Sequence, residues 1–140
     1  MTILRYLALA TDFDGTLATD GRLSDDAIGA VKRLRASGRR VILVTGRRLG
    51  QLLEILPMID LFDCVVAENG AVLYFPATQE ETLLCQPPPF AFVERLRALR
   101  VEPIEVGRVI VATWMPHQNA ILQAIQETGL ELLIVFNKLQ

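Results

Sequence analysis

Three apolar runs of strand length give the sequence its framework: residues 4–11, 41–44 and 64–67. None of them alternates apolar with polar positions, and such continuous runs are typical of parallel strands that are covered on both faces. Each run ends at a group of polar or small residues. The sequence therefore predicts three buried parallel strands.

Two amphipathic helices separate these runs. Ser24 can cap the first helix, with Asp25 and Asp26 in its first turn and Gly38 after its end. Pro57 stops the second helix, because proline has no N–H to donate. The apolar positions are Ala27, Val31 and Leu34 in the first helix and Leu49, Leu52, Leu53 and Leu56 in the second.

Asn69-Gly70 is a strong turn signal that joins the third strand to residues 71–75 as a hairpin. The order strand, helix, strand, helix, strand predicts the α/β class, as a Rossmann-like, doubly wound parallel sheet with helices on both sides and right-handed crossovers. Ligands of such sheets bind beyond the carboxyl ends of the strands, so we expect a site there.

Three consecutive prolines at 87–89 indicate a linker, after which a second α/β segment begins. Its predicted elements are a helix with Phe92, Leu96 and Leu99 on one face, a strand at 109–113, a helix with Ile121, Ala124, Ile125 and Thr128 on one face before Gly129, and a last strand at 130–136. We divide the chain into segments 1–80 and 81–140.

Composition narrows the class of protein. The chain has 140 residues, 51% of them hydrophobic and 21% charged, which predicts a globular protein with a sizeable core. A net charge of −2 argues against binding to nucleic acid or to an anionic membrane. Apolar runs stay far below the roughly 18 residues of a membrane-spanning helix. Cys64 and Cys85 fit no metal or redox spacing and no secretion signal precedes them, so we expect free thiols in the cytoplasm.

Asp12 and Asp14 follow the first predicted strand. Period-2 geometry sends both carboxylates to one side and Phe13 to the other. Two carboxylates repel each other unless a cation lies between them or one is protonated, so the pair suits either a Mg²⁺ site or an acid/base pair. A solvated acidic loop before Gly15 is the alternative.

Thr45-Gly46-Arg47 follows the second strand at the same edge and offers a hydroxyl, an accessible N–H and a guanidinium, which together suit a phosphoryl group. Ordinary turn chemistry is the alternative. After the third strand, Asn69 is either a polar contact in the same crevice or part of a type I′ hairpin turn. His117 is the only histidine, and the sequence has no GxSxG, GxGxxG, P-loop or zinc pattern.

Together, DFDGTL at 12–17, TGR at 45–47 and AENGA at 67–71 resemble motifs of the haloacid dehalogenase-like hydrolases, in particular the Cof-type, sugar-phosphatase-like branch. The resemblance covers the chain through Phe75. It implies that the segment from Pro87 onward is the beginning of the α/β cap that this branch inserts after its third core strand.

This resemblance implies a phosphatase mechanism. Asp12 would be the nucleophile that accepts the phosphoryl group as an aspartyl phosphate. Asp14 would protonate the leaving alkoxide and later deprotonate the attacking water. The carboxylate of Asp12 and the backbone carbonyl of Asp14 would hold Mg²⁺.

The other matched positions would bind the substrate, a small phosphorylated metabolite such as a sugar phosphate. Thr45 and the Gly46 N–H would hold the phosphoryl oxygens, and Arg47 and Asn69 would contact the rest of the molecule. The family pattern also has a lysine and an acidic GDxxND-like loop. Neither is found in its expected context, and Lys138 is not assigned the lysine's role.

By the resemblance, the chain stops inside the cap, which leaves a sheet edge open and predicts self-association into a homo-oligomer. Two other functions stay open. One is a non-catalytic phosphate- or metal-binding remnant that acts as an interaction or regulatory module, and the other is a receiver-like domain phosphorylated on aspartate.

Overall fold

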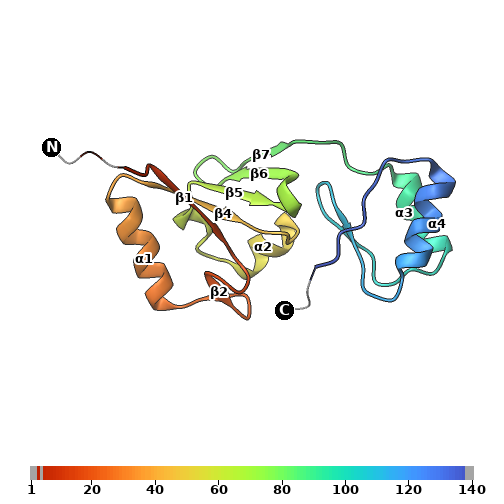
Figure 1. The fold of residues 1–140 in the computed structure, drawn as a ribbon, viewed down its shortest axis with the longest axis horizontal. Coiled ribbons are helices and arrows are strands. Elements are labelled where there is room, and N and C mark those ends of the chain that lie inside the picture. Colours follow the sequence, from red (N-terminus) through yellow and green to blue (C-terminus); the bar gives the residue numbers. More distant parts are fainter. Residues whose placement is uncertain (1–2, 4, 138–140) are drawn as a thin grey trace.

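The computed structural model describes residue 3 and residues 5–137. The N-terminal part of the molecule contains a central sheet and the helices α1 and α2, and α3 and α4 form the other end (Figure 1). A short hairpin lies between the sheet and the pair α3 and α4. In chain order the elements are β1 (Ala8–Asp12), β2 (Ala18–Thr19), β3 (Arg22–Leu23), α1 (Asp25–Ala36), β4 (Arg40–Val44), α2 (Leu49–Ile55), the 3₁₀ turn η1 (Ile59–Leu61), β5 (Cys64–Ala67), the 3₁₀ turn η2 (Glu68–Gly70), β6 (Val72–Phe75), β7 (Glu80–Leu83), α3 (Phe90–Ala98), β8 (Glu105–Val106), β9 (Val111–Ala112) and α4 (Gln118–Thr128).

The central sheet has the order β1-β4-β5-β6-β7. β1, β4 and β5 are parallel, whereas β6 and β7 continue the sheet in antiparallel pairs. This confirms the predicted α/β class and Rossmann-like core, as well as the hairpin after β5. β7 was not predicted, because its residues are mostly polar and exposed and show no strand pattern. β7 includes residues on both sides of the predicted division between residues 80 and 81. The division into two segments stays a prediction.

Helices cover only one face of this sheet in the described part of the chain. On β4, Val41 and Leu43 are fully buried, whereas Ile42 is half-buried and Val44 is exposed. Both α1 and α2 contribute to the hydrophobic cluster that contains Val41 and Leu43. β1, β4 and β5 follow one another in a single direction, so right-handed crossovers place both helices on the same side. The expectation of helices on both sides is therefore wrong for these residues.

β1 is an edge strand of the sheet, with β4 as its neighbour. Leu9 is 46% exposed, and Ala8 and Ala10 are exposed as well. The prediction of a buried strand over residues 4–11 is wrong in its burial and in its start. An apolar run is suited to burial, but a neighbouring element must cover it before it is buried.

Local signals placed the ends of the first two helices correctly. The Ala27 N–H donates to Ser24 Oγ at 3.1 Å, which caps α1 as predicted. After the last turn of α1, Gly38 adopts a positive φ of 90°. α2 ends at Ile55, before Pro57. Caps and breakers act within one turn, so neighbouring residues suffice to predict them.

The loop between β5 and β6 differs from the predicted type I′ turn. Ala67 pairs with Val72, which leaves four residues between the strands rather than two. Glu68, Asn69 and Gly70 all have positive φ, at 54°, 57° and 93°. A longer loop gives the end of β5 more backbone with which to reach neighbouring segments.

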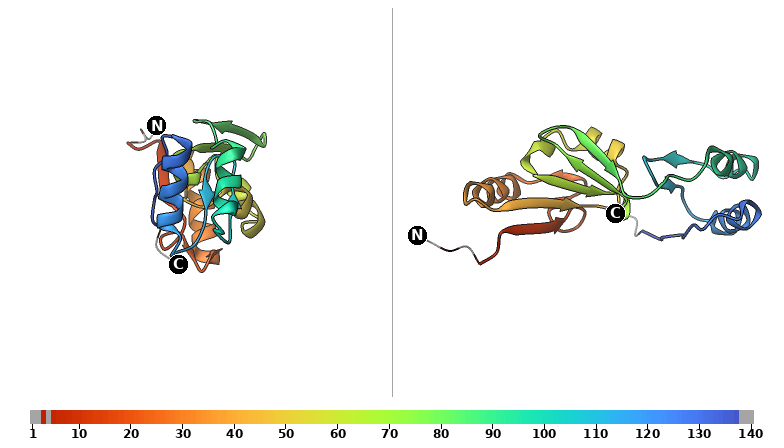
Figure 2. Two further views of the ribbon diagram at one scale, coloured as in Figure 1. Left: turned by 90° about the vertical axis from the view of Figure 1, so that its right-hand side faces the viewer. Right: turned by 90° about the horizontal axis from the view of Figure 1, so that it is seen from above.

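The second segment has a core of its own. α3 and α4 pack against each other through a cluster built on Phe92, Leu96, Val101 and Ala124 (Figure 2). Both helices were predicted, and Gly129 ends α4 with a φ of 66°. Among the described residues, no helix has the length and apolar character needed to cross a bilayer.

The strands predicted for the second segment are largely absent from the described residues. The run at 109–113 contributes only the two residues of β9, which pairs with β8. The run at 130–136 forms no strand, and Leu133 is 93% exposed. A strand requires a hydrogen-bonding neighbour, and this run passes from α4 back toward the sheet without one in the described part (Figure 1).

Candidate active site

The carboxyl ends of β1 and β4 lie side by side, since Asp12 is in register with Val44. Pairing continues one residue further on each strand. The Phe13 N–H donates to the Val44 carbonyl at 3.1 Å, and the Thr45 N–H donates to the Val66 carbonyl at 2.9 Å. The polar residues that follow these strands therefore share one edge of the sheet, as the sequence predicted.

Asp12 lies at this edge with its carboxylate open to solvent. Phe13 is fully buried, so the next side chain points into the core while Asp12 points away from it. One oxygen of Asp12, Oδ1, accepts a hydrogen bond from the Phe13 N–H at 3.0 Å. An exposed carboxylate on a fixed backbone is available to an incoming ligand.

Asp14 is bound by Arg47 rather than left beside Asp12 as half of a free acidic pair. Arg47 Nε donates to Asp14 Oδ2 at 2.7 Å and Nη2 donates to Oδ1 at 2.8 Å, a bidentate contact. The hydrogen bonds to Asp14 raise the pKa of Arg47 above its ordinary value, although burial lowers it. Both residues were predicted to belong to the site, but their contact with each other was not.

Thr45, Gly46 and Asn69 meet at the same edge. Thr45 is almost fully buried, and its Oγ1 accepts from the Arg47 N–H at 3.0 Å. A side chain at Gly46 would place its Cβ 2.6 Å from Asn69 Oδ1, so in this structure the Asn69 amide lies directly against residue 46. The loops after β4 and β5, predicted to share a crevice, are in contact.

A cleft of about 310 Å³ opens between Arg47 and the hairpin of β2 and β3. Asp20, Gly21 and Arg22 line one side, and Arg47 and Ile55 line the other. The sequence analysis missed these hairpin residues. Asp20-Gly21 was the available signal, because this dipeptide favours the positive φ values of 50° and 73° that the turn adopts. The cleft can receive the part of a ligand that lies beyond the carboxyl edge.

The donor atoms at the edge suit a hard cation in part. Asp12 and Asp14 offer oxygen ligands, which Mg²⁺ prefers, and Mg²⁺ often takes one or two carboxylates together with waters and substrate oxygens. Both carboxylate oxygens of Asp14 accept one hydrogen bond from Arg47, so its backbone carbonyl is the less occupied oxygen. Within residues 3 and 5–137, no cluster of three or more metal-ligating side chains forms.

The other candidate groups lie outside this edge. His117 precedes α4, as predicted, and its Nε2 lies 3.0 Å from the Glu102 carbonyl. Cys64 and Cys85 are free thiols, also as predicted. Burial raises the pKa of the half-buried Cys64 thiol above its ordinary value. None of these groups is positioned as a nucleophile for the site.

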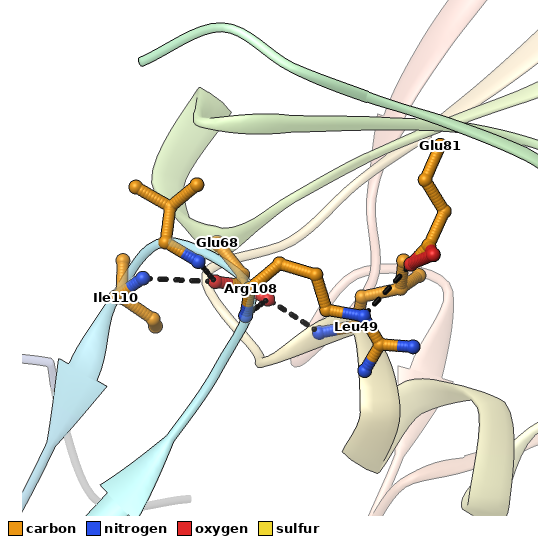
Figure 3. A network of polar contacts seen from close by, with 6 residues as sticks. Leu49, Glu68, Glu81, Arg108 and Ile110 are labelled. Atoms are coloured by element: carbon orange, nitrogen blue, oxygen red, sulfur yellow. Dashed lines mark hydrogen bonds and ion pairs between the residues drawn. The ribbon is translucent and has the colours of Figure 1, made fainter. Parts of the chain in front are cut away.

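Glu68 is the residue at this edge whose role the sequence did not indicate. Its side chain is fully buried, and its carboxylate accepts four backbone N–H groups, from Leu49, Arg108, Val109 and Ile110 (Figure 3). Burial raises the pKa of Glu68, but these hydrogen bonds outweigh it and hold the pKa below the ordinary value. Three of the donors are about 40 residues away in sequence, beyond the reach of local patterns.

Comparisons with known proteins agree with the motifs. A family model described as haloacid dehalogenase-like hydrolase matches residues 9–102. A phosphoglycolate phosphatase from Haloarcula marismortui is 36% identical over 72 residues, which cover 51% of this chain and 31% of the relative. A phosphoglycolate phosphatase from Saccharolobus solfataricus is 32% identical over 91 residues, which cover 63% of this chain and 39% of the relative. The chain thus spans about a third of the length of these relatives.

The fold is also found in a solved sugar phosphatase of haloacid dehalogenase subclass IIB. Its TM-score is 0.53 at 23% identity, over 86% of this chain and 48% of the other. At this identity the likeness concerns the fold alone. The family match over most of the chain, on a Rossmann-like sheet with the motif residues gathered at its carboxyl edge, shows that this protein belongs to the haloacid dehalogenase-like hydrolases.

Proposed function

We propose that this protein is a Mg²⁺-dependent phosphohydrolase that acts on a small phosphorylated metabolite through an aspartyl phosphate on Asp12. The observation that carries the proposal is the placement of Asp12, an exposed carboxylate beside the loop that follows β4 and two residues before the Asp14–Arg47 pair. Family membership supports the reaction class. A sugar phosphate is the proposed substrate, because the DFDGTL, TGR and AENGA motifs resemble those of the sugar-phosphatase-like branch.

Asp12 and Asp14 divide the chemistry between them. An oxygen of Asp12 forms a bond to phosphorus while the bond from phosphorus to the leaving oxygen breaks. Asp14, protonated on one oxygen and held by Arg47 through the other, donates its proton to the leaving oxygen. In the second half, Asp14 takes a proton from water as the water oxygen attacks phosphorus. Inorganic phosphate leaves and the Asp12 carboxylate is regenerated.

Arg47 can hold Asp14 and contact the substrate at the same time. A guanidinium carries five N–H donors, and the bidentate contact with Asp14 uses two of them. The remaining donors are available to oxygens of the phosphoryl group or of the leaving group in the cleft beside β2 and β3. This contact orients Asp14 toward the same ligand.

Thr45, Gly46 and Asn69 supply the neutral donors. The Thr45 hydroxyl accepts from the Arg47 N–H and retains its own proton to donate to a phosphoryl oxygen. Gly46 would offer its N–H, and Asn69, whose amide lies against Gly46, would offer its side-chain NH₂. Fixed donors of this kind stabilise the negative charge that develops on a transferring phosphoryl group.

Asp12, through its carboxylate, and Asp14, through its backbone carbonyl, are the residues that would hold Mg²⁺. When bound, the ion would neutralise the charge of the phosphoryl group and so permit approach of the Asp12 carboxylate.

A non-catalytic phosphate- or metal-binding module is the second candidate. The observation that favours it is that no cluster of three or more metal-ligating side chains forms among the described residues. Such a module would bind Mg²⁺ or phosphate without turning over a phosphate ester.

The test is hydrolysis of p-nitrophenyl phosphate, then of a panel of sugar phosphates and phosphoglycolate, with and without Mg²⁺. Wild type, Asp12→Asn and the matched control Asp26→Asn are compared. Asp26 is exposed in the first turn of α1 and lies outside the motif residues, so its variant controls for loss of one carboxylate. Circular dichroism verifies that all three fold.

Turnover that requires both Mg²⁺ and Asp12 and persists in Asp26→Asn is the expected result. Phosphate or Mg²⁺ binding by wild type without any turnover would instead support the binding module. Turnover that is equal in Asp12→Asn and wild type would overturn the assignment of Asp12.

A further inference from the structure

Glu68 bridges the two segments of the chain. Its Oε1 accepts from the N–H groups of Val109 and Ile110 at 2.8 and 2.9 Å, and its Oε2 accepts from that of Arg108 at 3.0 Å. These donors form the tip of the β8–β9 hairpin, which belongs to the second segment (Figure 3). The carboxylate is thereby the point at which the hairpin meets the sheet.

The hairpin tip is shaped for this contact. A Cβ at Gly107 would lie 2.5 Å from Glu68 Oε1 and 2.8 Å from the carboxyl carbon, closer than real Cβ atoms approach. Residue 107 must therefore be glycine for the hairpin backbone to come this near. Val109, beside it, is largely buried in the hydrophobic cluster of the first segment.

Glu68 also holds the loop that carries the proposed phosphate contacts. Its own N–H donates to the Arg47 carbonyl at 3.0 Å, and its Oε2 accepts from the Leu49 N–H at 3.2 Å. The backbone and the side chain of Glu68 thus bind the loop at Arg47 and at Leu49, on both sides of Arg48. Because Arg47 binds Asp14, the position of this loop determines where the Asp14 carboxylate points.

Two ion pairs flank the contact: Arg48 pairs with Glu105 at 3.1 Å, and Arg108 of the hairpin pairs with Glu81 of β7, a strand of the central sheet, at 2.7 Å. All four side chains are partly exposed, and exposed pairs contribute little. A buried carboxylate with four charge-assisted hydrogen bonds contributes more, because its donors lose their partner when it is removed.

We propose that Glu68 is a positioning residue: it fixes the β8–β9 hairpin on the carboxyl edge of the sheet and, through the same contact, fixes the loop that carries Arg47 and hence Asp14. This inference deepens the proposed phosphohydrolase function and rests on it for its catalytic part. The second segment is then coupled to the site through one carboxylate, so displacement of the hairpin displaces Arg47.

The experiment measures backbone amide exchange by NMR in wild type, Glu68→Gln, Gly107→Ala and the control Glu81→Gln. Glu68→Gln turns an NH₂ toward N–H donors. Gly107→Ala disturbs the same contact from the hairpin, because the added methyl group pushes the hairpin away from Glu68, and it changes no residue of the sheet. This second variant tests the contact even if Glu68→Gln fails to fold. Glu81→Gln removes the ion pair between the hairpin and β7 and keeps the buried carboxylate.

We expect exchange at Val109 and Ile110 to quicken by about tenfold or more relative to exchange at Val65 in the sheet, in both Glu68→Gln and Gly107→Ala, with Leu49 following. Glu81→Gln should leave all four amides as in wild type. Uniform acceleration that includes Val65 would mean global destabilisation and would overturn a positioning role. Unchanged exchange at Val109 and Ile110 in both variants would overturn the contact itself.

Kinetics separate this inference from the proposed function. With p-nitrophenyl phosphate, kcat should fall in Glu68→Gln and Gly107→Ala by a similar factor and stay at the wild-type value in Glu81→Gln. Accelerated exchange with kcat unchanged would overturn the coupling to Arg47. If wild type has no turnover, the proposed function fails, and the amide exchange at Val109, Ile110 and Leu49 still decides whether Glu68 fixes hairpin and loop.

Discussion

Asp14, after β1, and Glu68, after β5, are both bound carboxylates, but they are held in opposite ways. Asp14 accepts from one side chain, that of Arg47, and 19% of its own side chain stays exposed. Glu68 accepts from four backbone N–H groups and is fully buried. A guanidinium can reorient when a ligand arrives, whereas backbone donors move only when whole segments move. The region of Asp14 is therefore suited to exchanging partners, and the region of Glu68 to fixing positions.

The two contacts also differ in how much they contribute to the free energy of unfolding. Exposed ion pairs contribute about 0–1 kcal/mol to stability, and the bidentate, partly buried Asp14–Arg47 pair lies at the upper end of that range. Hydrogen bonds to a buried charge contribute about 1.5–3 kcal/mol each. When the acceptor is removed, the buried donors are left without a partner, and this lowers the stability of the folded protein. Substitution at Asp14 should thus show in catalysis, and substitution at Glu68 in stability as well.

The largest expected effect is on catalysis at Asp14. Asp14→Asn removes the proposed acid/base, so turnover of p-nitrophenyl phosphate should fall about 100- to 10,000-fold. The free energy of unfolding, measured with urea, should change by less than about 1 kcal/mol. A variant that loses much stability and keeps its turnover would reverse the comparison with Glu68. Asp26→Asn is the control.

Glu68→Gln should have the largest effect on stability. It should lower the free energy of unfolding by about 3 kcal/mol, because buried N–H groups lose a charged acceptor. Glu81→Gln, at a partly exposed pair, should cost less than about 1 kcal/mol. Urea titrations followed by circular dichroism measure both. Equal losses in the two variants would mean that the buried carboxylate is no stronger a contact than the exposed one.

Acidification should weaken the Glu68 contact without mutation. Its pKa in the folded protein lies below the ordinary 4.5, so its contribution to stability is present above about pH 4.5 and is lost as pH falls through the folded value. Urea titrations of wild type and Glu68→Gln should therefore differ most near neutral pH, with the gap narrowing below about pH 4.5. A gap that stays constant down to about pH 2 would contradict the charged state of Glu68.

Arg47→Lys tests whether the geometry at Asp14 matters beyond its charge. Lysine keeps the positive charge but cannot bind a carboxylate through two parallel N–H donors. We expect the catalytic efficiency to fall about tenfold, with stability nearly unchanged. Steady-state kinetics give the answer. Wild-type kinetics in this variant would show that a point charge is sufficient beside Asp14.

The smallest effect concerns the open edge of β1, where backbone groups face solvent in the described part of the chain. We propose that this edge, with Leu9 exposed, promotes weak self-association at about micromolar concentration and above. Leu9→Lys should shift sedimentation toward the monomer, since lysine on an edge strand opposes pairing. A monomeric wild type over the same concentrations would remove the basis for this proposal.

Much of the fold followed from short-range patterns. β5 was predicted because a short apolar run bounded by polar residues is typical of a buried strand. The helix caps at Ser24 and Gly38 were predicted because caps depend on adjacent residues. The carboxyl-edge site was predicted because parallel strands bring their ends together. The run at 130–136 failed as a strand because an apolar pattern contains no information about whether a neighbouring strand is present to pair with it.

By itself, the sequence determined which residues come to the carboxyl edge: Asp12, Asp14, Thr45 and Asn69 are delivered there by local signals along the chain. Only the tertiary structure decided what those residues contact. Arg47 binds Asp14 across 33 positions, and Glu68 binds a hairpin tip about 40 positions away. The physical reason is that local conformation depends on residues that are close in sequence. The partner of a buried or half-buried charge depends instead on how distant segments pack together, and no local sequence pattern contains that information.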